Sequence, residues 1–264
     1  MGIFAGGKAA RGNAGLGNTT TVGPYTVHVF TTTGANTFTP ATTGFVDILL
    51  VGGGGGGGPG SSDGGGGGGA GATLFKKMIP VTASTPYPIS IGAGGAATFS
   101  GTPTTFIYSG ITTTASGGGF GGPDSVPGAG ANVPTASGGG CGKYGPSVGP
   151  FPSPGGTGAG VLGIGFPGGA SGPGSPYTGG GGGGAGGAGA AGNPAGSGGR
   201  GGVGVPITYF TGISTDIASV GGPSGGNALT GITSTSYGSG GCCGTGANPA
   251  GSGGRQGVAY IRYI

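Results

Sequence analysis

The sequence contains few of the side chains on which enzyme catalysis depends. Charged residues make up 5% of the chain, glutamate is absent, and histidine occurs once, as His28. The four aspartates are far apart in sequence, so the chain has few side chains that could serve as a general acid or base. His28 alternates with Val27 and Val29 in a strand pattern, which predicts that its side chain faces solvent. We therefore expect a protein that is not an enzyme and holds no cofactor.

Cysteine is also scarce, and its spacing does not suit a metal site. The three cysteines are Cys141, Cys242 and Cys243, an odd number with one adjacent pair, which is not a disulfide framework. No Cys-x-x-Cys pair or histidine cluster accompanies them, so zinc is not expected. We interpret all three as buried small apolar residues.

Long apolar runs and clusters of basic charge are missing as well. No apolar run approaches the roughly 18 residues of a membrane span, and residues 1–4 lack the features of a signal peptide. The net charge of +4 comes from scattered basic residues, whereas a nucleic-acid site needs a basic cluster. These observations predict assembly in a cytoplasm and no binding to nucleic acid.

Glycine dominates what is present, with 83 residues, against an average usage of roughly 7%. Ordering glycine costs more backbone entropy than ordering any other residue, so a folded state must offset that cost with hydrogen bonds and close packing. Polyproline-II-like helices have three residues per turn and direct every backbone polar group outward. The runs at 52–58 and 64–69 are unbroken, which excludes the collagen repeat. We therefore expect a bundle of polyglycine-II helices, with proline-rich stretches at its corners.

A β-rich platform is expected beside this bundle. The apolar run 45–51 is typical of a buried strand and leads directly into the glycine run 52–58. No capping box or apolar stripe at helical spacing occurs, so the fold class is mostly β plus irregular, with essentially no α-helix. The expected parts are an arm (1–22), a β-sheet or sandwich platform (23–115) and a glycine-rich bundle (116–264). Strands are expected at 25–30, 37–39, 45–51, 73–81, 86–92 and 104–108.

Internal repeats support an ordered architecture. Residues 193–200 recur letter for letter at 248–255, and each copy leads into an apolar stretch. The second copy leads into residues 257–264, which end the chain without a charged tail. We expect this closing strand to lie beside residues 45–51.

Two groups of residues are candidates for binding. Lys8 and Arg11 lie in the arm, which is either a disordered terminus or a segment that attaches to a larger structure. Aromatic residues among glycine and proline either close the ends of the bundle or contact a receptor or partner. These aromatic residues are Phe120, Tyr144, Phe151, Phe166 and Tyr177.

Several motifs follow one another along the chain: residues 26–31, 36–39, 46–51 with the following glycine run, 89–95 and 258–263. Taken in order, these motifs resemble the glycine-rich domain of phage tail-fibre and other virion proteins. The chain is also similar in style to the adhesins at the tips of the long tail fibres of T-even phages, although it lacks their attachment domain. In those adhesins, polyglycine-II helices stack in layers and the end loops touch the receptor.

This resemblance implies a phage virion structural protein, as a tail fibre or adhesin subunit that is exposed on the particle and takes part in host attachment. The alternative is a capsid decoration, cement or head-fibre protein without a receptor role. An ice-binding protein would need longer threonine arrays than residues 19–21 and 31–33 provide. The implied partners are other virion proteins through the arm, a host surface glycan or outer-membrane protein, and further copies of the chain.

Overall fold

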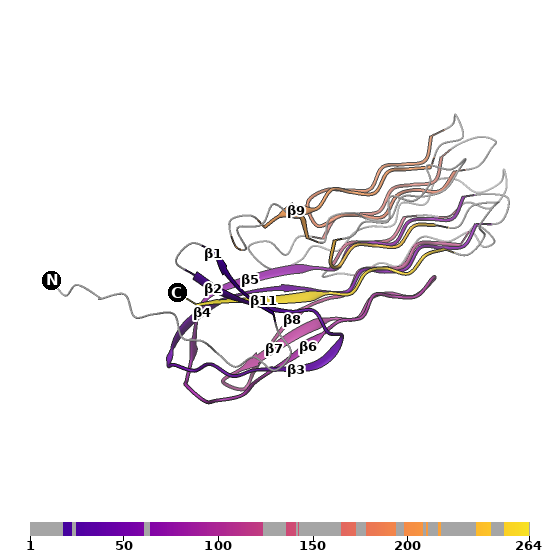
Figure 1. Cartoon of the computed structure of the whole chain (residues 1–264). Coiled ribbons are helices and arrows are strands. Elements are labelled where there is room, and N and C mark those ends of the chain that lie inside the picture. Colours follow the sequence, from indigo (N-terminus) through magenta and orange to yellow (C-terminus); the bar gives the residue numbers. More distant parts are fainter. Residues whose placement is uncertain are drawn as a thin grey trace.

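The computed structural model is built mostly from β-strands, with essentially no helix among the residues that it describes (Figure 1). In the described part no helix is long and apolar enough to cross a membrane. The described residues are 18–22, 25–60, 64–123, 136–140, 142, 165–172, 178–193, 198–207, 210, 216–217, 236–243 and 251–263.

The strands form two larger antiparallel sheets and one short pair. The order in the first sheet is β1-β2-β11-β4-β5, and the order in the second is β3-β6-β7-β8; β9 pairs with β10. The strand bounds are β1 Asn18–Val22, β2 Tyr25–Phe30, β3 Gly34–Phe38, β4 Gly44–Val51, β5 Thr73–Val81, β6 Tyr87–Ile91, β7 Thr104–Tyr108, β8 Ile111–Ala115, β9 Val205–Pro206, β10 Asp216–Ile217 and β11 Val258–Tyr263.

The last strand, β11, completes the first sheet by inserting between β2 and β4. Val258 pairs with Val51 and Tyr263 with Val46, so β11 runs antiparallel to β4 along nearly its whole length. The expected position of the closing strand beside residues 45–51 is therefore confirmed. Since β11 also pairs with β2, it joins the β1–β2 pair to the β4–β5 pair within the first sheet.

Both faces of the first sheet are covered by apolar side chains. Val46, Ile48 and Leu50 of β4 pack with residues of both larger sheets in one cluster, which we call the inter-sheet cluster. Leu49 and Val51 point the other way, into a second cluster that includes Phe210. This arrangement explains why β4 is apolar on both faces apart from Asp47, rather than alternating apolar with polar residues.

The interpretation of His28 as a solvent-facing residue is wrong. Its side chain is fully buried, with its ring 5.6 Å from the rings of both Phe38 and Tyr263. The alternation with Val27 and Val29 holds, but the opposite face of β2 meets the inter-sheet cluster instead of water. Burial lowers the pKa of His28, so the neutral imidazole is the stable form in the core.

The second sheet contains a strand that the sequence patterns did not indicate. The β7–β8 hairpin turns at Ser109 (φ 48°) and Gly110 (φ 73°), and left-handed residues at both turn positions suit a two-residue hairpin. The Lys76 ammonium of β5 donates to the Thr113 hydroxyl of β8 (3.1 Å), which links an edge of each sheet. At the other end of the first sheet, the last residues of the expected arm form β1, which pairs with β2.

Beyond the sheets, the chain continues as extended glycine tracts that lie side by side (Figure 1). The central tract, residues 52–58, follows β4 and donates its amide hydrogens to three different neighbours in rotation, so that each neighbour is met at every third residue. The stretch 66–72 accepts from Gly52, Gly55 and Gly58, through the carbonyls of Ala72, Gly69 and Gly66 respectively. The stretch 99–102 accepts from Gly53 and Gly56, through Thr102 and Phe99, and the stretch 252–255 accepts from Gly54 and Gly57, through Arg255 and Ser252. The N···O distances are 2.8–3.0 Å.

The carbonyl groups of the central tract bond in rotation as well. Their donors come from three further stretches: 118–121, 95–98 and Gly241. A Cβ atom at any residue from 52 to 58 would lie within 2.1 Å of a backbone oxygen of a neighbouring stretch. Only glycine allows backbones to approach this closely on every side, so the packing explains the unbroken run.

The last two residues of the eight-residue repeat have equivalent backbone bonding in both copies. The amide of Gly199 donates to Gly179 and the amide of Gly254 donates to Gly95, while the following arginine carbonyl accepts from another tract in each copy. Arg200 and Arg255 are therefore structural equivalents, and both side chains are exposed.

Candidate functional site

The structure describes two of the seven residues that the sequence singled out. Lys8, Arg11, Tyr144, Phe151 and Tyr177 lie outside the described residues. The remaining two, Phe120 and Phe166, are half-buried.

Phe120 and Phe166 lie within glycine tracts. The carbonyl of Phe166 accepts a hydrogen bond from Gly138 (3.1 Å), and a Cβ at Gly139 would meet the carbonyl of Phe120. Both phenylalanines thus border the tract 136–140. These contacts are made by the backbones of the two residues.

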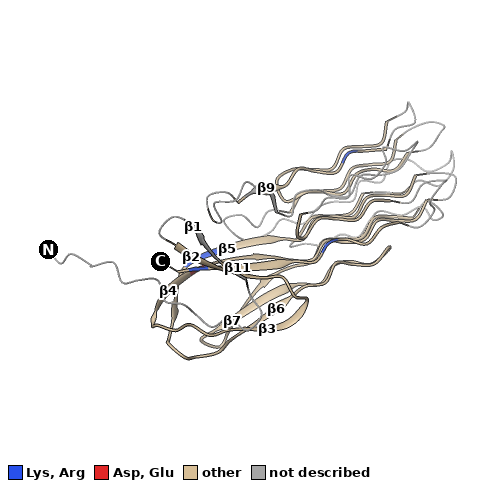
Figure 2. Ribbon diagram, in the orientation of Figure 1, with Lys and Arg blue, Asp and Glu red and all other residues tan. Residues whose placement is uncertain are grey.

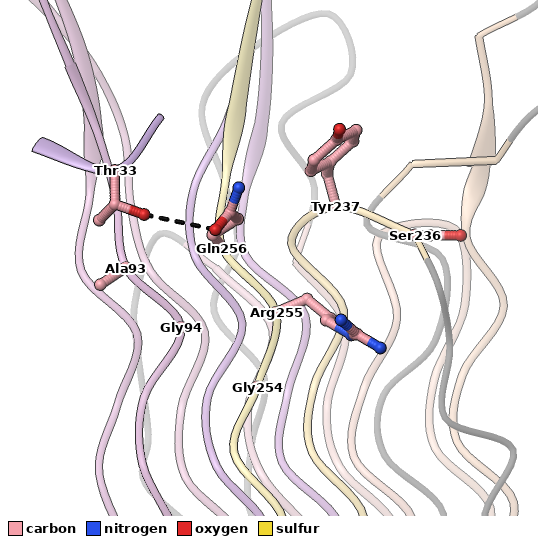
Figure 3. A pocket seen from close by; sticks show the side chains of 8 residues that line it. All are labelled: Thr33, Ala93, Gly94, Ser236, Tyr237, Gly254, Arg255 and Gln256. Carbon is pink, nitrogen blue, oxygen red and sulfur yellow. Dashed lines mark hydrogen bonds between the residues drawn. The ribbon is translucent and has the colours of Figure 1, made fainter. Parts of the chain in front are cut away.

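A pocket of about 460 Å³ lies where the sheets meet the glycine tracts, and we call it the seam pocket (Figure 3). Four separate stretches of chain contribute to it: the β2–β3 connection, the residues after β6, the residues before the tract 238–243, and those before β11. Its lining residues are Thr33, Ala93, Gly94, Ser236, Tyr237, Gly254, Arg255 and Gln256.

Backbone hydrogen bonds hold these stretches together. Gly254 donates to Gly95 (2.8 Å), Arg255 donates to Ser239 (2.8 Å), and Gly238 donates to Gln256 (2.7 Å). Each bond joins two of the contributing stretches or their immediate neighbours. The pocket is therefore formed by the same bonding that builds the glycine tracts, and it exists before any ligand arrives.

Side-chain hydrogen bonds fix the orientation of Gln256. Its Nε2 atom donates to the carbonyl of Thr31 (2.6 Å), and its Oε1 atom accepts from the Thr33 hydroxyl at 3.4 Å. Tyr237, in contrast, rests on the second apolar cluster, so that one side of its ring is anchored in the core. In Figure 3 the Arg255 side chain extends away from Gln256 and Thr33, with the Tyr237 ring above it and Ser236 on the far side.

The charge at the seam pocket is positive. Arg255 is exposed, and none of the eight lining residues is acidic. Figure 2 shows basic positions along the glycine tracts as well as among the strands of the sheets. The pocket thus combines a cation, an oriented amide, hydroxyl groups and an aromatic ring.

A second charged group lies on the face of the first sheet that is turned away from the second sheet, and it is structural. Arg262 Nη2 contacts Asp47 Oδ2 at 2.7 Å, and the guanidinium lies 4.6 Å from the ring centres of Tyr25 and Phe210. The other carboxylate oxygen of Asp47 accepts from the amide of Met78, at a bulge between β4 and β5. Both side chains are largely buried, at 13% and 4% exposure, so the pair ties β11, β4 and β5 together.

The described cysteines lie at the edge of the glycine tracts. Cys242 and Cys243 are half-buried, which differs from the full burial expected of them, and Cys141 lies outside the described residues. Burial raises the pKa of the Cys242 thiol, which keeps it protonated at neutral pH. Among the described residues, no three histidine, cysteine or acidic side chains lie together as a metal site.

Comparison with protein families identifies the chain. The family model for the glycine-rich domain matches residues 31–264. The chain belongs to this family. The matched region of the glycine-rich domain includes β3 to β11, the glycine tracts and the seam pocket. A search among curated proteins finds no match.

Sequence reasoning missed the seam pocket, although one signal pointed to it. The second copy of the repeat ends at Arg255, and Gln256 follows directly. A basic residue, Arg255, closes the repeat directly before the expected strand 257–264, and this position marks the end of the tract. The other half of the pocket, Thr33 and Tyr237, is brought there by tertiary pairing alone.

Proposed function

We propose that the glycine tracts form a bundle of polyglycine-II helices and that the two larger sheets form a β-sandwich beneath it. Support for the bundle comes from the central tract, which meets each neighbour at every third residue, because a polyglycine-II helix has three residues per turn. Support for the sandwich comes from the inter-sheet cluster, where Phe30 and Ile48 of one sheet pack with Phe38 and Phe106 of the other.

From this architecture we propose a structural and attachment role rather than a catalytic one. β4 enters the bundle and β5 leaves it, with antiparallel bonds between residues 52–58 and 66–72. Residues 58 and 66, where these two tracts meet, therefore lie at the end away from the sheets. A rigid bundle of this kind holds its end loops at a fixed distance from the platform, and loops on a rigid scaffold commonly carry binding.

The specific role that we propose is that of a phage virion protein, a tail fibre or adhesin subunit exposed on the particle. The single observation that carries this proposal is the rotating hydrogen-bond pattern of residues 52–58, which suits the layered glycine bundles of the adhesins that the sequence resembles. In this proposal the arm with Lys8 and Arg11 binds other virion proteins. Tyr144, Phe151 and Tyr177 contact a host surface glycan or outer-membrane protein.

Two measurements test this role. Antibody labelling of intact particles should place the protein at a fibre tip, and purified protein should compete with particles for adsorption to host cells. Replacing Tyr144, Phe151 and Tyr177 with serine should remove the competition. Phe45→Ser is the matched control, since Phe45 is an aromatic residue of the platform that is 48% exposed. Labelling spread over the capsid shell, with no competition by the wild-type protein or by Phe45→Ser, would favour a decoration role instead.

A further inference from the structure

The seam pocket has the size and rigidity of a small-molecule site. Its volume of about 460 Å³ lies within the range of roughly 300–1,000 Å³ that is usual for ligand pockets. Its walls are backbone stretches joined by hydrogen bonds of 2.7–2.8 Å, including the Gly238–Gln256 and Arg255–Ser239 bonds. Because the pocket is formed in advance, little of the free energy of ligand binding is lost in ordering its walls.

The polar groups of the pocket suit a ligand with several hydroxyl groups. Ser236 supplies a hydroxyl, which can donate or accept, and the Thr33 hydroxyl, which donates to Gln256, can accept. Gln256 supplies an amide held by its bond to Thr31, and its Nε2 carries a second N–H. Tyr237 adds a flat aromatic surface whose position is set by the second apolar cluster. Hydroxyls, an oriented amide and an aromatic face together match the alternating polar and apolar faces of a sugar ring.

The guanidinium of Arg255 selects for a negative charge on that ligand. Guanidinium presents a planar fork that matches a carboxylate with two parallel hydrogen bonds. The eight lining residues include no acidic side chain that would repel such a group. A neutral sugar would offer this cation only hydroxyl groups, whereas a sugar carboxylate would offer it a charged acceptor.

We propose that the seam pocket binds a carboxylate-bearing sugar, such as a uronic acid of a surface polysaccharide, with Arg255 on the carboxylate and Tyr237 under the ring. This site deepens the proposed attachment role and rests on it for its biological meaning. It is distinct from the aromatic residues at 144, 151 and 177, and it lies at the base of the bundle rather than at its end.

Titration calorimetry on the purified full chain tests the site. The probe is cellobiouronic acid at about 0.15 M salt, and cellobiose is the neutral control, since it differs only in carrying a hydroxymethyl group in place of the carboxylate. A hydrogen bond to a charged group contributes about 1.5–3 kcal/mol, which is a factor of at least about ten in affinity. We expect the acid to bind at least about tenfold more tightly than cellobiose.

The repeat provides a matched pair of variants. Arg255→Gln should remove the preference for the acid, whereas Arg200→Gln, at the equivalent position outside the pocket, should leave it unchanged. Equal affinity for the two sugars, no binding of either, the same loss in both variants, or full competition by inorganic phosphate would each overturn the proposal. The calorimetry uses isolated protein, so a negative result there does not bear on where the protein lies on the particle. A negative result of the particle labelling, in turn, does not change the measured affinity for the sugar.

Discussion

Alanine at Gly55 should destabilise the protein strongly, although the change adds one methyl group. A Cβ at this position would lie 2.1 Å from the carbonyl oxygen of Gly119, whereas ordinary contact begins near 3.4 Å. The tract that contains Gly119 would have to move by more than an ångström. Gly55 cannot turn away instead, because its own amide and carbonyl are bonded to Gly69 and Gly241 at 2.9 and 2.8 Å.

The loss of stability expected for Gly55→Ala follows from the packing and the hydrogen bonds that this movement disturbs. Forcing a methyl group into a packed interior costs about 1–3 kcal/mol, and occasionally more. Moving the neighbouring tract also strains its bonds to the central tract, from Gly118 to Gly53 and from Gly121 to Gly56. Each buried backbone group left without a partner costs about 1–3 kcal/mol. We expect Gly55→Ala to lower the free energy of unfolding by at least about 3 kcal/mol.

Gly44→Ala is the control for this measurement. Gly44 begins β4, has no positive φ, and a Cβ there would meet nothing within 4 Å. Its replacement should change stability by less than about 1 kcal/mol, since loss of chain freedom in the unfolded state is the main effect. Urea denaturation of both variants gives the comparison. Equal unfolding midpoints for Gly55→Ala and Gly44→Ala would refute the close packing of the central tract.

Three further predictions concern the platform. The free energy of unfolding should fall as the pH drops below about 6.5, because burial lowers the folded-state pKa of His28 and the unfolded chain then binds more protons. His28→Phe should flatten that slope in urea titrations at several pH values, and an unchanged slope would exclude His28 as the cause. Asp47→Asn should cost about 3–5 kcal/mol by removing the carboxylate that faces the buried Arg262 cation, whereas Asp47→Leu combined with Arg262→Met should recover most of that loss. Equal stability of Asp47→Asn and wild type would contradict a stabilising buried pair. Deleting residues 258–264 should abolish cooperative unfolding by circular dichroism, and a retained transition would show that β11 is dispensable.

Much of the platform could be predicted from the sequence because its strands carry their own signals. The expected strands 73–81 and 104–108 match β5 and β7 residue for residue, and the apolar run 45–51 lies within β4. β8 was missed because residues 111–115 consist mainly of threonine and give no apolar alternation. The orientation of His28 was misjudged because a strand pattern shows that two faces differ, but not whether the second face meets water or another sheet.

The seam pocket could not be predicted because its parts meet only through long-range pairing. Thr33 and Gln256 are 223 residues apart in sequence, and they become neighbours because β11 inserts next to β2. The glycine tracts present the opposite case. Their composition restricts the chain to close backbone packing, but identical residues carry no information on which tract lies beside which.

Residue-resolved amide hydrogen exchange through residues 52–58 tests the glycine bundle most directly. Every amide from Gly52 to Gly58 donates to a backbone carbonyl of another stretch, so all seven should exchange slowly and with similar protection. Ala188 is the internal control and should exchange fast, since it is exposed and its amide donates to no backbone carbonyl within the described part of the chain. Fast exchange throughout residues 52–58, or protection only at alternate residues as at the edge of a β-sheet, would contradict a tract bonded on all sides.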